Sequence, residues 1–384
     1  MESPQLIWQQ PDWPALSYQP HVVSEAVARA RHSHQLVQAK LAALGWKDVQ
    51  QLAAEAWEQE AVSTAAIEGQ QLDVLAVRSS IARRLGAPGG KDQGYVPREV
   101  DGLLDAMDDA LVNAKAPLTH ERLQAWQAAL FPSGMSGMRR VRVAAYREHA
   151  EAMQIVSGRA GHETVHYEAP PSQDVPGQMQ RFLDWFNSAS EPGAPVKAAL
   201  AHLWFETIHP FEDGNGRVGR VLVDLVLARD GGEATRLVRI SQRLERQRNA
   251  YYEQLERAQH GPLDVTPWVL WFIEQVRAAW DAAGEVADVS VQKARFWLEH
   301  AQHDITHRQR KAVNVLLDTG PGKFEGGMSA GKYVSLTGAS KATATRELAQ
   351  LLALGFVQQV GAGRSTRYYI NLPGWAAPGR PPRH

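Results

Sequence analysis

The residues best placed to do chemistry lie in one segment, from His209 to Arg220. Gly214 and Gly216 let the backbone approach a ligand closely, because glycine has no Cβ atom. An almost wholly apolar stretch follows, and this pattern predicts a loop that leads into a buried helix. The free backbone N–H groups at the start of such a helix form a concave site that suits phosphate oxygens.

The charged side chains of the same segment could bind the phosphates of a polyphosphate and a metal ion, and its histidine could act as a base. Arg217 and Arg220 fall on one face of the expected helix, where two guanidinium groups can hold different phosphates. Asp213 offers the oxygen ligand that magnesium prefers, and His209 can take a proton from an attacking hydroxyl. The predicted phosphate-binding residues are Asp213, Gly214, Asn215, Gly216, Arg217, Val218, Gly219 and Arg220.

Each part of this segment has a simpler interpretation by itself. A histidine before a proline, or a Gly-Asn-Gly run, is usually a turn, and two arginines on a helix usually lie on a solvated face. Here a base, a metal ligand, an anion site and an arginine clamp coincide. The coincidence favours a site that transfers a phosphate-containing group.

The composition of the chain limits the class of protein. A chain of 384 residues usually divides into two or three domains, and we expect three. The net charge of -1 gives no global attraction to nucleic acid or anionic lipid, so any such binding must be local. There are no cysteines, which excludes disulfides and thiolate metal sites. No basic, apolar leader and no membrane-spanning run are present, and we expect a cytoplasmic protein.

The elements that must position the site are mostly helices. Apolar residues recur at helical spacing from Ser24 to Leu44 and from Val49 to Ile67. The Gly- and Pro-rich run Gly86–Gly90, continuing to Pro97, predicts a linker, with a second domain beginning near Arg98. The one strand-like stretch, from Met153 to Tyr167, has the pattern of a hairpin around Gly158–Gly161. We expect the rest of this domain, up to Trp280, to be helical, and a helical stretch from Val286 to Ala301 to follow.

The segment from His209 to Arg220 resembles, without a mismatch, the signature of the Fic family: His, any residue, Phe, any residue, Asp or Glu, Gly, Asn, Gly, Arg, two free positions, Arg. The resemblance covers most of the chain. Ile7–Pro14 looks like the start of the helical domain that precedes Fic in many bacterial proteins. The resemblance implies a protein adenylyltransferase that uses ATP and Mg²⁺, with His209 as the base and Asp213 as the metal ligand.

Two further regions are similar to functional parts of the family. Tyr146-Arg147, the hairpin and Pro170-Pro171 resemble its flap, which aligns the target by strand addition. The resemblance places Val165, His166 and Tyr167 on that flap. Residues that in relatives wall the adenine correspond to Tyr251, Tyr252, Leu255 and Gln259, although some relatives have Asn at the last position. Helix packing is the alternative role for the tyrosines.

Thr64–Gly69, at the end of the second helix, resembles the inhibitory motif of Fic proteins: Ser or Thr, three residues, Glu, then Gly or Asn. A glutamate is unfavourable at a helix C-terminus, so Glu68 needs a cationic partner. The resemblance implies that the partner is Arg220 and that Glu68 takes the guanidinium meant for the γ-phosphate. The alternative is an ordinary helix end.

The segment from Lys332 to Leu348 resembles a winged helix-turn-helix, with a turn at Thr337-Gly338 and a cap at Ser340. From Asp304 to Leu372 there are nine Lys or Arg and four Asp or Glu. This surplus could bind a DNA backbone, or it could be a solvated face of a protein-binding or dimerising module.

Together these features predict a mainly α fold, a Fic-type helical bundle with a small β-hairpin flap and a C-terminal winged helix-turn-helix. The expected domains are 1–90 (helical, with the inhibitory helix), 91–283 (Fic) and 284–384 (winged helix, with a disordered tail after Pro373). The expected partners are ATP, a target protein and the chain itself, with DNA through 304–372 and a homodimer as further possibilities and no membrane.

Two rival functions stay open at this stage. The same site could remove AMP, or it could transfer another nucleotide group. The chain could also be a DNA-binding regulator whose Fic domain senses a nucleotide, although sensing needs no base such as His209. The target, the signal that relieves inhibition and the oligomeric state do not follow from the sequence.

Overall fold

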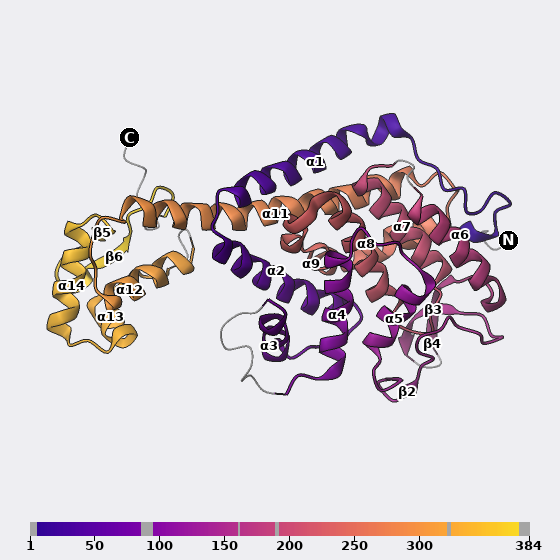
Figure 1. Cartoon of the computed structure of the whole chain (residues 1–384), viewed down its shortest axis with the longest axis horizontal. Coiled ribbons are helices and arrows are strands. Elements are labelled where there is room, and N and C mark those ends of the chain that lie inside the picture. The colour runs from indigo at the N-terminus through magenta and orange to yellow at the C-terminus, as the bar shows by residue number, and fades with distance from the viewer. Residues whose placement is uncertain (1–5, 86–94, 160–161, 189–191, 321–323, 376–384) are drawn as a thin grey trace. The chain divides into compact units, whose positions relative to one another are not determined.

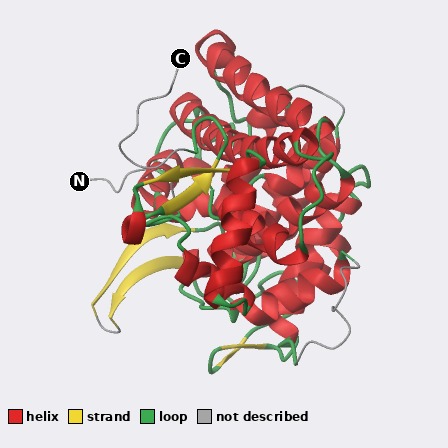
Figure 2. Ribbon diagram, turned by 90° about the vertical axis from the view of Figure 1, so that its left-hand side faces the viewer, coloured by secondary structure: helices red, strands yellow, loops and turns green. Residues whose placement is uncertain are grey.

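The computed structural model describes residues 6–85, 95–159, 162–188, 192–320 and 324–375. The expected linker Gly86–Gly90 lies outside these residues, as does the expected disordered tail after Trp375. At Trp375 the prediction of disorder is wrong, because this side chain is buried and donates to Gln292 Oε1 at 2.6 Å. The chain forms two compact units, Met1–Glu285 and Val286–His384. Both are mainly helical and contain short antiparallel hairpins (Figures 1 and 2). This confirms the predicted fold class, while the division of the first unit at residue 90 stays a prediction.

The first unit is built mostly of helices. Two short 3-10 turns, Ile7–Gln9 and Ser172–Asp174, precede α1 and α6, and a third spans Gly232–Leu237. The helices are α1 (Pro20–Ala42), α2 (Trp46–Ile67), α3 (Val74–Arg84), α4 (Arg98–Val112), α5 (His120–Leu130), α6 (Val175–Asn187), α7 (Ala194–Ile208), α8 (Asn215–Gly231), α9 (Ile240–Arg246), α10 (Arg248–Gln259) and the N-terminal part of α11 (Thr266–Glu299).

Helices α7 and α8 form the centre of this unit. Nearly every residue of α7 from Pro195 to Ile208 is buried, as is most of α8. Helices α2, α4 and α5 pack on α8, and α6 packs on α7 (Figure 1). Because both helices are held on several sides, the loop that joins them has a fixed position.

The hairpin expected from Met153 to Tyr167 is present as β3 (Gln154–Arg159) and β4 (His162–Glu168), with an irregularity between Ile155 and Val156. A second, two-residue hairpin of β1 (Met135–Ser136) and β2 (Arg139–Arg140) was not expected. The prediction that everything else before Trp280 is helical is therefore wrong for residues 131–153. Gly134 and Gly137 adopt positive φ angles of 69° and 57°, which turn the chain away from a helix.

The second unit is a helix-turn-helix with a wing. It contains the end of α11, α12 (His307–Asp318), α13 (Ala330–Thr337), α14 (Lys341–Ala353), and the hairpin of β5 (Val357–Val360) and β6 (Arg367–Ile370). A short 3-10 turn, Gly363–Ser365, lies between the two strands. Gly338 ends α13 at φ 70°, and the Ser340 side chain accepts the Thr343 N–H at the start of α14, as the sequence predicts.

Helix α11 runs without interruption from Thr266 to Glu299, so the helical structure expected up to Trp280 and the helical stretch expected from Val286 belong to one helix. Gly284 lies inside this helix and does not have a positive φ angle. Lys40 Nζ donates a hydrogen bond to the Gly284 carbonyl at 3.2 Å, which helps to hold the helix at this position. Among the described residues no helix has both the length and the apolar character that crossing a membrane requires.

Candidate active site

The end of α7 places His209 at the mouth of the loop. His209 has φ 49° and ψ 61°, and this left-handed conformation ends the helix. Its N–H still donates to Phe205 O, at 2.9 Å. A positive φ is unfavourable for a residue with a Cβ atom, so the surrounding structure must impose it.

Arg147 holds this strained turn in place. Its side chain is buried, and it donates from Nε to His209 O at 2.8 Å and from Nη2 to Ile208 O at 3.2 Å. It also donates to Pro170 O, at 2.5 Å, and to Ser172 Oγ, at 2.8 Å. One guanidinium therefore joins the end of α7 to the segment after the flap. This role of Arg147 could not be predicted from its place beside Tyr146 in the expected flap region.

The loop from His209 to Asn215 is closed from within. Asn215 Oδ1 accepts the Phe211 N–H at 2.9 Å, and Asn215 Nδ2 donates to Phe211 O at 2.8 Å. Phe211 is fully buried, and Gly214 takes φ 88°. Because its amide is used in this clamp, Asn215 can offer a ligand only its backbone N–H. Val218 has no free group for a ligand, because its side chain lies in the core and its N–H donates to Gly214 O at 3.0 Å.

The two arginines of the motif are buried side by side on α8. Arg217 donates from Nη1 to Gln70 Oε1 at 3.0 Å, lies 3.7 Å from Asp213 Oδ1, and packs 4.8 Å over the Phe131 ring. Arg220 is 1% exposed and is surrounded by the C-terminal turn of α2. Both guanidinium groups thus face the end of the helix that carries the expected inhibitory motif.

Arg220 forms the ion pair with Glu68 that the sequence led us to expect. Its Nη2 donates to Glu68 Oε1 at 2.8 Å and to Thr64 O at 3.0 Å, and its Nε donates to Thr64 Oγ1 at 2.7 Å. Burial by itself would lower the pKa of this guanidinium, but the Glu68 carboxylate raises it above its usual value. A Cβ atom on Gly216 would lie 2.2 Å from Glu68 Oε1, so the carboxylate covers the first turn of α8.

His209 is neutral at physiological pH. Burial, and next the positive charge of Arg147, lower the pKa of its imidazole to about 4. The ring also makes a hydrogen bond to the backbone carbonyl of Glu206. Its Nδ1 is turned toward Glu206, 3.7 Å from Oε2. An imidazole that donates from Nδ1 keeps Nε2 free of a proton, as a base requires.

The residues expected to wall the adenine lie on α10, mostly buried. Tyr251 is 2% exposed and its hydroxyl lies 2.8 Å from His202 Nε2. Leu255 and Gln259 are also buried. Tyr252 is 39% exposed and donates to Ile67 O, at the end of α2, at 3.4 Å. Of the four, Tyr252 is the side chain most open to a ligand, and the roles of all four stay predictions.

The flap residues divide between surface and core. Val165, in register with Val156 across the hairpin, is 50% exposed. His166 Nδ1 lies 3.5 Å from Glu256 Oε2. Tyr167 is 2% exposed, and its hydroxyl donates to Thr207 O at 2.8 Å. Tyr167 therefore fastens the flap to α7, while Val165 is available to a partner.

Metal ligands in this site are few. The described residues contain no group of three or more His, Cys, Asp or Glu side chains placed to hold an ion. Asp213 is 32% exposed on its side chain, and its Oδ1 accepts the Gly214 N–H at 2.6 Å. A single half-exposed carboxylate at a phosphate site fits magnesium, which binds through few protein ligands and the phosphates themselves.

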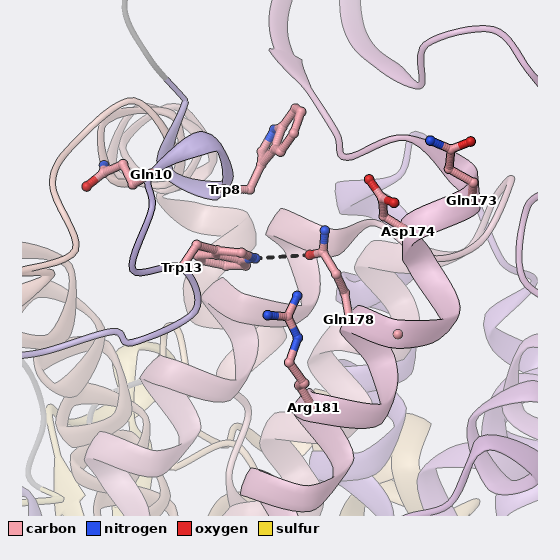
Figure 3. Close-up of a pocket in the computed structure, with 8 residues that line it drawn as sticks. Trp8, Gln10, Trp13, Gln173, Asp174, Gln178 and Arg181 are labelled. Atoms are coloured by element: carbon pink, nitrogen blue, oxygen red, sulfur yellow. Dashed lines mark hydrogen bonds between the residues drawn. The ribbon is translucent and has the colours of Figure 1, made fainter.

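A separate groove of about 530 Å³ lies between the N-terminal segment and α6 (Figure 3). Trp13 Nε1 donates to Gln178 Oε1 at 3.0 Å on its floor. Trp8, at one side, donates to Glu168 O at the end of β4. The groove contains none of the residues from His209 to Arg220. The N-terminal segment therefore supports the base of the flap.

Comparison with known proteins defines the class of this site. Residues 117–227 match the profile of the Fic/DOC family, so the chain carries a Fic domain. Residues 6–87 match a domain of unknown function (DUF4172). Residues 326–371 match the C-terminal domain of a transcriptional regulator described as DIP2311-like.

The curated relatives that match are named as adenylyltransferases. The protein adenylyltransferase Fic of Nematostella vectensis is 30% identical over 218 residues, which cover 56% of this chain and 46% of that protein. A probable protein adenylyltransferase of Aquifex aeolicus is 32% identical over 99 residues, which cover 26% of this chain and 28% of that protein. The chain thus spans less than half the length of these relatives.

Among solved structures, a Fic family protein from Desulfovibrio desulfuricans G20 resembles the chain over 96% of this chain and 99% of that one. The TM-score is 0.56 and the sequence identity 21%. The likeness shows that the two chains share a fold.

Proposed function

We propose that this chain is a protein adenylyltransferase, which moves AMP from ATP onto a hydroxyl group of a target protein. One observation carries the proposal. Glu68 Oε1 lies against Arg220 and the first turn of α8, so an anionic oxygen already occupies the place where a phosphate oxygen would bind. The names of the curated relatives support the same reaction.

The phosphates of ATP would lie along the start of α8. The backbone N–H groups of Asn215 and Gly216 and the guanidinium groups of Arg217 and Arg220 bind their oxygens, whereas the Gly214 N–H is taken by Asp213 Oδ1. Asp213 would hold a magnesium ion, which neutralises phosphate charge when it is bound. Val165 and its neighbours on the flap align a segment of the target by strand addition.

Transfer then proceeds as one balanced step. His209 Nε2 accepts the proton of a Ser, Thr or Tyr hydroxyl, and the hydroxyl oxygen attacks the α-phosphorus of ATP. The bond from the α-phosphorus to the bridging oxygen breaks, and pyrophosphate leaves with the electron pair. Positioning and charge stabilisation supply most of the rate enhancement.

The direct test is a lysate incubated with α-labelled ATP and the Glu68→Gly protein, followed by autoradiography. We expect labelled target bands and labelling of the chain itself. Parallel reactions with labelled GTP and UTP identify the nucleotide, and release of label from a modified target would identify AMP removal instead. Absence of protein labelling with every nucleotide would refute the proposed transfer.

Loss of the Asp213 carboxylate should remove the metal dependence of transfer. We expect Asp213→Ala to reduce magnesium-dependent labelling roughly 10-fold or more, because several kcal/mol of phosphate stabilisation depend on the metal. Folding should change little, since the side chain is partly exposed. Labelling rates measured against magnesium concentration test this, with Asp12→Ala, an exposed aspartate elsewhere, as the control. Full wild-type activity in excess chelator would contradict the metal role.

The second unit has a surface that favours DNA as a further partner. The carboxylate of α14, Glu347, is 3% exposed and is bound by Arg308 at 2.6 Å and by the Tyr333 hydroxyl. The exposed face of α14 therefore presents Lys341 and Arg346 without an opposing acid. In helix-turn-helix proteins the second helix enters the major groove.

Reversal of one of these charges should weaken DNA binding. We expect Arg346→Glu to lower the affinity for duplex DNA about tenfold and to reduce the slope of log K against log salt by about 1. Fluorescence anisotropy over a range of salt concentrations measures both. Arg295→Glu, the same change on the exposed face of α11, is the matched control. Equal effects of the two substitutions, or no salt dependence in the wild type, would argue for a protein-binding role.

A further inference from the structure

Helix α7 carries a buried carboxyl group directly before the proposed base. Glu206 is 5% exposed, and it precedes His209 by one helical turn in an otherwise mostly apolar helix. Its Oε2 lies 3.7 Å from His209 Nδ1. Its Oε1 is buried and has no hydrogen-bond partner among the described residues. A carboxyl group is costly in such a place, so it calls for an explanation.

The neighbouring helix is shaped to accept this side chain. A Cβ atom on Gly219 would lie 2.4 Å from Glu206 Oε1 and 3.2 Å from His202 Nδ1. Any larger residue at position 219 would therefore displace the carboxyl group. Gly219 was predicted to be part of the phosphate site. Its place beside Glu206 gives it a different role, which is to leave room for the Glu206 carboxyl group.

The charged and titratable groups that face Glu206 come from four helices. They are His202 and His209 on α7, Arg220 on α8, Glu68 on α2 and Tyr251 on α10. Burial raises the pKa of Glu206 to about 8, Arg220 lowers it and Glu68 raises it. Burial lowers the pKa of His202 to about 3, and the pKa of Tyr251 is raised well above its usual value. The pKa shifts of His202 and Tyr251 thus lead away from neutral pH, whereas that of Glu206 leads toward it.

We infer that Glu206 is a positioning residue for His209, whose ionised carboxylate behind Nδ1 stabilises the imidazolium that forms when Nε2 takes the proton of the target hydroxyl. The inference rests on the proposed function. The proton moves from the hydroxyl to Nε2, the Nδ1 proton stays on Nδ1, and the imidazolium later returns a proton to solvent. Glu206 itself forms and breaks no bond.

A purely structural role for Glu206 makes a different prediction. If the carboxyl group only fills space, its replacement by glutamine would leave the pH dependence of kcat unchanged. The positioning role couples the two groups, because a negative charge near Nδ1 makes the ring more basic and alters its electronic environment. The titration of the His209 ring therefore tests whether the two groups are coupled, and the pH dependence of kcat separates the two roles.

Nuclear magnetic resonance on the full chain labelled with [¹³Cε1]-histidine measures this titration. The His209 signal is identified by its absence from His209→Asn. In the wild type we expect its shift to show an inflection near pH 8, which Glu206→Gln removes and Glu206→Asp retains. In Glu68→Gly we expect the inflection at lower pH, because a neighbouring negative charge is gone. No inflection between pH 6 and 9 in the wild type, or an unchanged inflection in Glu206→Gln, would overturn the inference.

A second test measures the rate of AMP transfer as a function of pH, in the Glu68→Gly background at saturating ATP. The rate should rise with pH as Glu206 ionises, and Glu206→Gln should flatten this profile and lower kcat about tenfold while leaving the KM for ATP unchanged. A flat profile in the parent would also overturn the inference. If the chain transferred no AMP at all, the proposed function would fail while the resonance titration still decided whether Glu206 and His209 are coupled.

Discussion

Replacement of His209 by alanine should reduce AMP transfer at least 100-fold while leaving ATP binding largely intact. The imidazole lies at the mouth of the loop. It is neutral, and it is hydrogen-bonded to the backbone carbonyl of Glu206, so it can accept a proton without first losing one. General-base catalysis contributes about 100- to 10,000-fold in enzymes. Single-turnover labelling with α-labelled ATP in the Glu68→Gly background measures the loss.

The controls must distinguish loss of the imidazole base from loss of the folded structure. His209 is the last residue of the turn that Arg147 fixes through backbone carbonyls, and alanine keeps those carbonyls. ATP binding by calorimetry should therefore match the parent protein. His32→Ala, on the exposed face of α1, should label normally. Activity of His209→Ala within a few-fold of its parent would remove His209 from the mechanism.

The sequence was most informative where one short segment performs one task. The types and spacing of His209, Asp213, Arg217 and Arg220 were enough to predict a phosphate site, and the structure does gather the two arginines on one side of α8. The pairing of Glu68 with Arg220 was expected from a separate motif and is present at 2.8 Å. The motif from His209 to Arg220 encodes local geometry and can be interpreted without a fold, whereas the pairing of Glu68 with Arg220 was implied only by the resemblance to Fic proteins.

Where no such resemblance pointed to a contact, roles that depend on tertiary contacts could not be predicted. Asn215 was expected at the phosphates, but its side chain closes the loop on Phe211. Tyr167 was assigned to the flap, but its hydroxyl anchors the flap to α7. Both contacts join backbone groups whose positions a sequence does not reveal.

Glu206 is an intermediate case. A glutamate inside a stretch as apolar as Ala198–Ile208 was a signal that could have been used, since an unpaired charge is rarely buried there. The sequence could not reveal that there is space beside the Glu206 carboxyl group. The gap exists because Gly219, on another helix, has no side chain.

Replacement of Glu68 by glycine should increase AMP transfer roughly 10- to 150-fold. In the wild type Glu68 binds Arg220 and covers the first turn of α8, so a γ-phosphate must displace it before ATP can settle. A hydrogen bond to a charged group contributes about 1.5 to 3 kcal/mol, and this energy sets the fraction of ATP bound in the productive position. Self-labelling with α-labelled ATP at equal protein concentration measures the increase.

The direction of the change separates inhibition from simple support of the helix. Thr64 also binds Arg220, and Glu60, earlier on α2, accepts the Ser241 and Gln242 N–H groups at the start of α9, so α2 stays in place when Glu68 is removed. Glu68→Gln, which keeps the length of the side chain and loses its charge, should give an intermediate rate. Gln71→Gly, which loosens the same connection without touching Arg220, should leave the rate unchanged. A folded Glu68→Gly protein that transfers AMP no faster than the wild type would rule out inhibition by Glu68, because the two proteins differ only at this residue.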